Sequence, residues 1–288
     1  MPAIAAALVP IRCWRPLLDD VRAPTRHLRI ALAAVLLGLG SPAAARAQLV
    51  GAATVESQYR PTGVSLTNGE PDLRLSLSYD HVSGAYAGGS VIGAQTARDG
   101  LQAVGYVAYA GFAKQAANGL VWDVGATNSD LTLYLLVQRA ARLPQGMVYP
   151  PGYNPGSAQG TTRRYGLNYS EIYGGVSLSS LSARVYLSPD YLGRNLRTAY
   201  FDVTETIRPI NRLRLYAHVG ALTPFGGSAD SAGLGGGGSD WDVRAGAAWE
   251  FHRGEIQLAW TRTEPRVEYP LGYHQARDAL IVSVAGFF

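Results

Sequence analysis

The last residues of the chain, Asp278-Ala279-Leu280-Ile281-Val282-Ser283-Val284-Ala285-Gly286-Phe287-Phe288, decide the fold class. Counted back from Phe288, every second residue is apolar or glycine: Gly286, Val284, Val282 and Leu280. A period of two is the pattern of a β-strand with one apolar face. Bacterial outer-membrane barrels end in a strand of this kind, whose terminal aromatic lies at the membrane interface and is recognised by the barrel-assembly machinery. The stretch therefore predicts the closing strand of such a barrel, with Phe288 as its assembly signal.

The amino-terminal segment predicts export. An apolar run at residues 30–39 follows Arg22, Arg26, His27 and Arg29, and it precedes the small-x-small cleavage site Ala45-Arg46-Ala47. This is the pattern of a secretory signal peptide, whose apolar run is too short to span a bilayer as a helix. We therefore expect residues 1–47 to be a signal peptide removed near Ala47, and residues 48–288 to form one mature domain. Because residues 1–20 make the region before the apolar run very long, we place the start of translation near Val21.

Cysteine and charge exclude several classes of function. The only cysteine, Cys13, lies in the segment that is removed and has no lipobox, which excludes disulfides, a lipid anchor and cysteine-ligated metals. Residues 1–47 also contain six arginines and two aspartates, so 19 basic and 19 acidic residues remain of the 25 and 21 in the full chain. A mature chain without net charge or a basic run does not indicate a nucleic-acid partner.

Hydrophobic residues after Gln48 alternate with polar ones instead of forming the ~20-residue apolar run of a transmembrane helix. In residues 72–79, for example, each odd position is apolar or aromatic and each even position is polar. The same alternation recurs at 181–188, 212–219 and 240–249. Segments of about ten residues suit a tilted strand that crosses a hydrocarbon layer better than the shorter strands of globular sheets. Aromatics near segment ends fit two interfacial girdles: Tyr59, Tyr79, Trp122, Trp241, Trp249 and Trp260.

About twelve strands are expected, at 50–60, 72–82, 84–93, 101–113, 119–128, 168–179, 181–191, 197–208, 212–222, 240–251, 255–264 and 278–288. Short connections then alternate with mostly long ones, as short periplasmic turns alternate with outer loops in bacterial barrels, and an even count returns both ends to the periplasm. The link at 192–196 is expected to be a short outer hairpin. The register is least secure at 128–168, where residues 131–137 extend the fifth strand or form a separate one, and where loop 143–166 is expected to fold over or into the pore.

The fold class is therefore all-β: a transmembrane, antiparallel, up-and-down β-barrel of about twelve strands. Because a closed barrel leaves no strand edge to pair, we expect a monomer. We place it in the outer membrane of a Gram-negative bacterium, in contact with outer-membrane lipids and lipopolysaccharide. The alternative is a soluble periplasmic β-sandwich, which would bury Leu73, Leu75, Leu213 and Leu215 between two sheets.

Several short blocks also resemble a known family. Ser57-Gln58-Tyr59-Arg60, Gly63-Val64-Ser65, Pro71 and residues 83–88 are similar to the opening of the Gcw_chp family of uncharacterised bacterial proteins. Later blocks continue the resemblance over nearly the whole mature chain: 171–175, 186–191, 217–220 and 240–242. The chain differs at Thr62, where the family more often has arginine, and in an insertion after Asn128. The resemblance implies an exported β-rich protein and no established activity or catalytic residue.

Projecting the alternation inward predicts which ionisable residues line the lumen. An arginine or lysine at the lipid midplane costs ~2–4 kcal/mol, so the charged positions must face inward. Basic and acidic groups in the set are nearly balanced, which favours an ion-paired filling or a narrow polar pore over a strongly ion-selective one. The lumen-lining candidates are Glu56, Arg60, Arg74, Asp80, Asp123, Glu171, Arg184, Asp202, Arg214, His218, Asp242 and Arg244.

The function expected is therefore a narrow, porin-like channel for small polar solutes or a structural barrel. One alternative is an adhesion barrel that binds through outer loops 143–166 and 223–239. A second is an outer-membrane lipid hydrolase that uses His218, but no serine or asparagine stands in a nucleophile motif beside any histidine, so we expect no catalytic residue. No cofactor or metal site is expected, because Asp240 and Asp242 lack calcium-loop spacing and are interpreted as charges at the outer rim, near Arg214 or Arg262.

Overall fold

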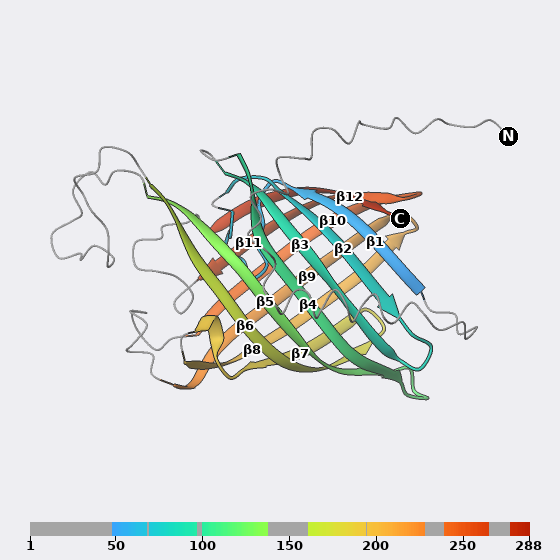
Figure 1. Ribbon diagram of the computed structural model, residues 1–288. Coiled ribbons are helices and arrows are strands. Elements are labelled where there is room, and N and C mark those ends of the chain that lie inside the picture. Colours follow the sequence, from blue (N-terminus) through green and yellow to red (C-terminus); the bar gives the residue numbers. More distant parts are fainter. Residues whose placement is uncertain are drawn as a thin grey trace, which may run out of the picture. The chain divides into compact units, whose positions relative to one another are not determined.

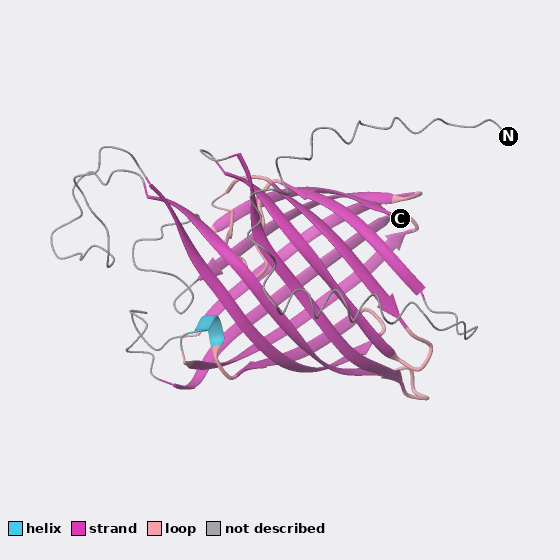
Figure 2. Cartoon of the chain, viewed as in Figure 1, coloured by secondary structure: helices cyan, strands magenta, loops and turns pink. Residues whose placement is uncertain are grey.

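The computed structural model describes residues 48–288 apart from 68, 97–99, 138–160, 194, 228–238 and 265–276. The described residues form a closed antiparallel barrel of twelve strands (Figures 1 and 2). The expected signal peptide lies outside the described residues. No helix in the described part is long and apolar enough to cross a membrane. The strands are β1 (Gln48–Glu56), β2 (Asp72–Asp80), β3 (Ala85–Thr96), β4 (Gly100–Gln115), β5 (Val121–Val137), β6 (Thr161–Leu178), β7 (Leu181–Ser188), β8 (Leu196–Ile210), β9 (Leu213–Gly227), β10 (Asp240–Phe251), β11 (Gly254–Glu264) and β12 (Asp278–Phe287).

Each strand pairs with its neighbours in sequence, and β1 closes the barrel on β12. Ala52 lies opposite Phe287, and Gly51 and Phe288 exchange backbone hydrogen bonds of 2.9 and 3.0 Å. The last residue thus takes part in closure, and the Phe288 ring occupies the space that a side chain on Gly51 would need. The predicted up-and-down barrel is confirmed.

The alternation read from the sequence places apolar side chains outside and polar ones inside. On the outer surface, Ile172 and Leu280 each expose 62% of their area, whereas the inward Asp123 exposes 5%. This is the reverse of a soluble protein, in which large exposed apolar surfaces are rare. The sandwich alternative is wrong, because the strands form one closed sheet and Leu75 is exposed on its outer face.

Several strand boundaries differ from the sequence-based expectation. β5 continues to Val137 in unbroken register with β6, so residues 131–137 extend the fifth strand. The first six positions of β6 (161–166) were expected to be loop; the rest of loop 143–166 lies outside the described residues. β1 ends at Glu56, so residues 57–60 leave the strand, and the outer link at 192–196 contains the 3-10 helix η3 (Tyr191–Gly193).

The barrel has two unlike ends. The tight connections β2–β3, β4–β5, β6–β7, β8–β9 and β10–β11 all lie at one end, which we call the turn end. The opposite end, the loop end, carries η3 and the β1–β2 connection at residues 57–71. Both described chain ends, Gln48 and Phe288, lie at the turn end, because β1 begins there and β12 finishes there.

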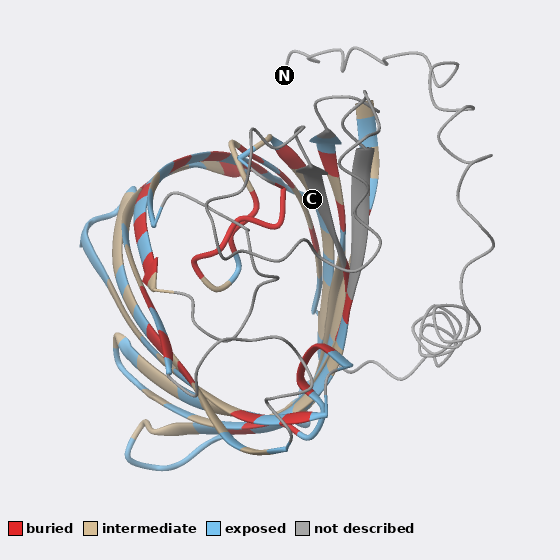
Figure 3. Ribbon diagram, turned by 90° about the vertical axis from the view of Figure 1, so that its left-hand side faces the viewer, coloured by how far each residue is buried: buried red, intermediate tan, exposed pale blue. Residues whose placement is uncertain are grey.

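The β1–β2 connection, which we call the inner loop, turns into the barrel. Figure 3 shows buried loop segments inside the ring of strands. Val64 and Ser65 expose 1% and 0% of their area, and Tyr59 is also buried, so Tyr59 does not belong to an interfacial girdle as expected. The loop satisfies its own polar groups: Leu66 N donates to Tyr59 O (2.9 Å), Tyr59 N to Thr67 Oγ1 (3.1 Å) and Gly69 N to Ser65 Oγ (2.9 Å).

An apolar core inside the loop-end half of the barrel surrounds this loop. Tyr59 and Leu66 of the inner loop and Tyr191 and Leu192 of η3 belong to one buried cluster with wall residues of six strands. Such a cluster is the side-chain packing of a globular core, placed within a barrel. The wall members are Ile92, Ala94, Val104, Leu131, Leu167, Leu196 and Leu222.

Candidate functional site in the barrel interior

Eleven of the twelve lumen candidates lie on inward faces of strands, and the twelfth, Arg60, lies in the inner loop. Arg60 is buried there and donates to Gly63 O (2.8 Å) and Gln58 Oε1 (2.8 Å). The alternation misplaced it because β1 ends four residues earlier. The eleven on strands are Glu56, Arg74, Asp80, Asp123, Glu171, Arg184, Asp202, Arg214, His218, Asp242 and Arg244.

The first charged group lies beneath the inner loop. Arg74 Nη2 binds Glu56 Oε1 at 2.5 Å, and its guanidinium carbon lies 5.8 Å from the centre of the Tyr59 ring. Burial raises the pKa of the Tyr59 phenol, so this ring is a neutral face for the cation. Asp72 lies directly opposite Glu56, exposes 3% of its area, and has no hydrogen-bond partner on either carboxylate oxygen. Arg74 therefore binds only one of two buried carboxylates that lie opposite each other.

The second group lies nearer the turn end, on β3, β5, β6 and β7. The Arg184 guanidinium binds Asp123 Oδ2 at 3.1 Å and lies 5.8 Å from the centre of the Tyr173 ring. Tyr86 OH donates to Asp123 Oδ2 (3.1 Å) and lies 2.7 Å from Tyr173 OH. This network joins four strands. Arg184 supplies the positive charge that the buried Asp123 carboxylate needs.

The third group lies at the mouth of the turn end. Arg214 binds Glu250 at 3.2 Å and Glu255 at 2.5 Å, and it lies 5.9 Å from the centre of the Tyr216 ring. Arg208 also reaches Glu250, at 3.0 Å. Gln257 donates to Tyr216 OH.

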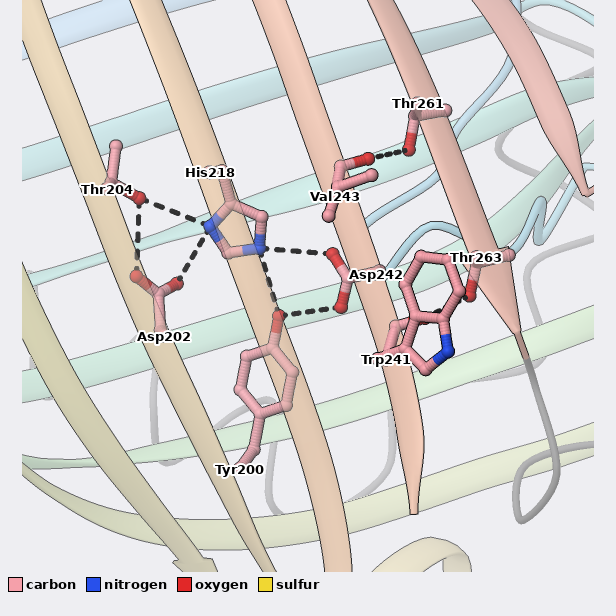
Figure 4. A network of polar contacts seen from close by, with 9 residues as sticks. All are labelled: Tyr200, Asp202, Thr204, His218, Trp241, Asp242, Val243, Thr261 and Thr263. Carbon is pink, nitrogen blue, oxygen red and sulfur yellow. Dashed lines mark hydrogen bonds and ion pairs between the residues drawn. The ribbon is translucent and has the colours of Figure 1, made fainter. Parts of the chain in front are cut away.

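The fourth group is centred on His218 (Figure 4). Its Nε2 lies 3.0 Å from Asp242 Oδ1 and 3.2 Å from Tyr200 OH, which itself donates to Asp242 Oδ2 at 3.0 Å. On the other side, Nδ1 lies 3.2 Å from Thr204 Oγ1 and 3.7 Å from Asp202 Oδ2. Each imidazole nitrogen thus faces one carboxylate and one hydroxyl.

Asp242 does not have the rim position expected from the sequence. It is 5% exposed and binds His218 and Tyr200, whereas Arg214 binds the two glutamates at the turn end and Arg262 lies on the outer face near Asp278 (3.6 Å). The inner loop rests on this region: a Cβ on Gly63, which has φ +80°, would lie 2.9 Å from Asp242 Cβ and 2.7 Å from Thr263 Cβ. Only a glycine fits there, because the position needs both a positive φ and this close approach.

Inward tyrosines lie over glycines of neighbouring strands. A Cβ on Gly220 would lie 2.1 Å from Tyr200 OH and 2.5 Å from Asp242 Oδ2. The missing side chain makes room for the ring, and the ring covers the bare backbone in return. The other pairs are Tyr86 over Gly111, Tyr109 over Gly88, Tyr173 over Gly125 and Tyr216 over Gly246.

The interior is acidic among the described residues, which corrects the expected balance of charge. Sequence reasoning omitted four inward carboxylates: Asp72, Asp240, Glu250 and Glu255. Asp240 shares a face with Asp242 in the sequence pattern, but the two were assigned to the rim. Glu250 and Glu255 flank the β10–β11 turn, where too few alternating residues remain to show which face a side chain occupies. With them, the described inward carboxylates outnumber the arginines that reach the interior, which are Arg60, Arg74, Arg184, Arg208, Arg214 and Arg244.

The described residues contain no group of three or more histidine, cysteine, aspartate or glutamate side chains arranged to hold a metal ion. The chemistry that the arrangement supports is electrostatic. It offers carboxylates, phenol hydroxyls and ring faces to whatever occupies the lumen, and cations interact favourably with all three.

Solved structures of outer-membrane barrels are similar to this chain at low identity. OmpF of Salmonella typhi is 10% identical over 84% of this chain and 97% of its own, with a TM-score of 0.37. OmpT of Vibrio cholerae is 9% identical over 86% and 99%, with a TM-score of 0.39. The translocator domain of the autotransporter NalP from Neisseria meningitidis is 9% identical over 91% and 94%, with a TM-score of 0.38.

No curated protein matches the chain. Residues 41–131 match the family described as "Bacterial protein of unknown function (Gcw_chp)", which confirms over that part of the chain the resemblance read from the sequence.

Proposed function

We propose that the protein is a barrel of the bacterial outer membrane that passes small polar solutes, cations in preference to anions, through a lumen narrowed by the inner loop. The observation that carries this proposal is the inward fold of residues 57–71 within an interior that is rich in carboxylates. A loop of this kind restricts the size of a solute, and an excess of carboxylates repels anions.

The outer surface supports the membrane location. Exposed apolar side chains surround the barrel, and aromatics lie among them near the turn end, including Trp122, Trp249 and Phe288. A closed barrel with an apolar outer band and interfacial aromatics satisfies its backbone polar groups in lipid without water. The turn end then faces the periplasm and the loop end faces outward, in contact with lipopolysaccharide. We also propose export by cleavage near Ala47, assembly through the strand that ends at Phe288, and a monomeric state.

The decisive experiment is single-channel recording with refolded residues 48–288 in a planar bilayer, after heat-modifiable gel mobility has shown that the barrel is folded. In a tenfold potassium chloride gradient, the expected reversal potential has the sign of a cation-preferring pore. Discrete steps with the anion-preferring sign would contradict the role of the carboxylates. A folded barrel without conductance would instead favour the structural role.

Hydrolysis is a second candidate because the two imidazole nitrogens of His218 contact the Asp242 carboxylate on one side and the Thr204 hydroxyl on the other. In a Ser-His-Asp site the carboxylate holds one imidazole nitrogen and the nucleophile hydroxyl binds the other. Here Thr204 Oγ1 lies 3.2 Å from His218 Nδ1 and 3.3 Å from Asp202 Oδ1, so a second carboxylate competes with the imidazole for the threonine proton. We therefore propose that the barrel is not an enzyme. Lipid-ester hydrolysis by refolded protein that is lost in His218→Ala, with the barrel still folded, would contradict this.

The adhesion alternative depends largely on residues outside the described part of the chain, in loops 143–166 and 223–239. Shortening these loops separates the two roles. If the loops bind a partner, the shortened variant loses cell adhesion and keeps the wild-type conductance. If the function lies in the lumen, the wild-type protein itself shows no adhesion.

A further inference from the structure

We propose that the turn-end half of the lumen binds a guanidinium-bearing solute between the ring of Tyr109 and the carboxylate of Asp80. This rests on the cation preference proposed above and specifies the class of solute.

Three arginines of the interior each lie over a tyrosine ring and bind a carboxylate. Arg184 lies 5.8 Å from the Tyr173 ring centre and binds Asp123 at 3.1 Å. Arg214 lies 5.9 Å from the Tyr216 ring and binds Glu255 at 2.5 Å, and Arg74 lies 5.8 Å from the Tyr59 ring and binds Glu56 at 2.5 Å. A planar guanidinium suits both partners, because it is attracted to an aromatic face and forms charge-assisted hydrogen bonds with a carboxylate.

Tyr109 and Asp80 repeat this pair without an arginine. The Tyr109 ring lies over Gly88, so the backbone covers one side of the ring, and 37% of the residue remains exposed. Asp80 is exposed at the last position of β2, on the inward side of the strand. Among the described residues, no guanidinium or ammonium group forms an ion pair with Asp80, and none lies over the Tyr109 ring.

Tyr86 supplies the back of the site. It lies directly opposite Asp80 across β2 and β3, and its ring centre is 6.3 Å from that of Tyr109 with an angle of 52° between the planes. The Tyr86 hydroxyl is held by Asp123 and Tyr173, which fixes the ring. Asp80 lies at the turn end, so a solute reaches it without passing the inner loop. Two ring faces and one carboxylate suit a flat monovalent cation, whereas a metal ion needs more oxygen ligands.

The test is isothermal titration of refolded residues 48–288 in detergent micelles with methylguanidinium chloride, and with methylurea as the neutral compound of the same shape. At low ionic strength, methylguanidinium should bind at least about fivefold more tightly than methylurea. Asp80→Asn and Tyr109→Leu should each weaken methylguanidinium binding by about threefold to fivefold, since each removes one of the two recognition groups.

Two matched variants control for indirect effects. Tyr109→Phe keeps the ring face and should retain the wild-type affinity within about twofold. Asp278→Asn removes an exposed carboxylate from the outer face near Arg262 and should leave binding unchanged. If Tyr109→Leu fails to fold, the affinities of Asp80→Asn and Asp278→Asn for methylguanidinium still test the site.

Equal affinity for methylguanidinium and methylurea, or full affinity in Asp80→Asn, would overturn the site. Failure of the site is distinguishable from failure of the channel. A cation-preferring pore that does not discriminate the two compounds keeps the proposed function and loses this site. A silent barrel that binds methylguanidinium through Asp80 keeps the site and loses the pore.

Discussion

The two halves of the lumen are filled in different ways by strands of the same alternating pattern. In the loop-end half, a segment of backbone and an apolar core occupy the interior, and buried residues such as Val64 and Leu131 have the low exposure of a globular core. In the turn-end half, the wall itself fills the interior with arginine-carboxylate pairs and tyrosines, and Tyr109 and Asp80 stay exposed. In the channel proposed above, size restriction and charge selection would thus be set by different parts of the barrel, the first by the inner loop and the second by strand side chains.

Removal of the inner loop should have the largest effect. Replacing residues 60–68 by Gly-Gly removes the backbone that occupies the loop-end half, so single-channel conductance should increase by a factor on the order of a few-fold, with the sign of selectivity unchanged. The control shortens the connection at 228–238 by the same number of residues, with no expected change in conductance. Equal conductance of the loop deletion and the wild type would show that the inner loop does not limit the path.

Breaking the second charged group should destabilise the turn-end half. Arg184→Met leaves Asp123, which is 5% exposed, without its cation. We expect a loss of about 2–3 kcal/mol in the free energy of unfolding, below the value for a fully buried pair because lumen water reaches Arg184. Arg262→Met, which removes an exposed outer pair with Asp278, should cost less than ~0.5 kcal/mol. Denaturant unfolding in detergent measures both, and equal losses would remove Asp123 from this structural role.

Adding a side chain at Gly220 tests whether the close packing around His218 stabilises the barrel. Gly220→Val places a Cβ 2.1 Å from Tyr200 OH and 2.5 Å from Asp242 Oδ2, so the His218 group must move. Overpacking of this kind should cost about 1–2 kcal/mol. Gly174→Val is the matched control, because a Cβ on that glycine meets nothing closer than 3.9 Å. If both variants unfold at the same denaturant concentration, the close contact of Tyr200 with Gly220 does not constrain the fold.

The barrel could be predicted from the sequence because a period of two is a local property, and ten-residue strands repeat it along the chain. The inward residues followed from the same period. The inner loop could not be predicted, since its direction depends on contacts of Gly63 with Asp242 and Thr263, far away in sequence. A usable signal was present in the apolar Val64 and Leu66 beside Gly63, an unusual composition for a solvated outer loop.

The contacts between inward side chains could not be predicted from the sequence either. His218 was assigned to the inward face correctly by alternation, but its contacts with Asp242 and Tyr200 depend on the register of β8, β9 and β10. A shift of two residues in either pairing would keep every side chain on its face and replace every partner. Ion pairs between strands are therefore beyond what the pattern of one strand can specify.

The smallest predicted effects separate the two halves most cleanly, because they compare two aspartates at opposite ends of β2. Asp72 is buried opposite Glu56 with both oxygens unpartnered, so Asp72→Asn removes the repulsion between the two carboxylates and should raise the free energy of unfolding by about 1 kcal/mol at neutral pH. It should leave ion selectivity unchanged, since the carboxylate lies within the packed loop-end half.

Asp80 should behave in the opposite way. It is exposed at the turn end, so Asp80→Asn should change stability by less than ~0.5 kcal/mol and should shift the reversal potential slightly toward zero. Paired denaturant titrations and bilayer recordings of the two variants test this contrast. If Asp72→Asn changes selectivity as much as Asp80→Asn does, ions reach the buried carboxylate, and the inner loop then narrows the path without sealing the loop-end half from it.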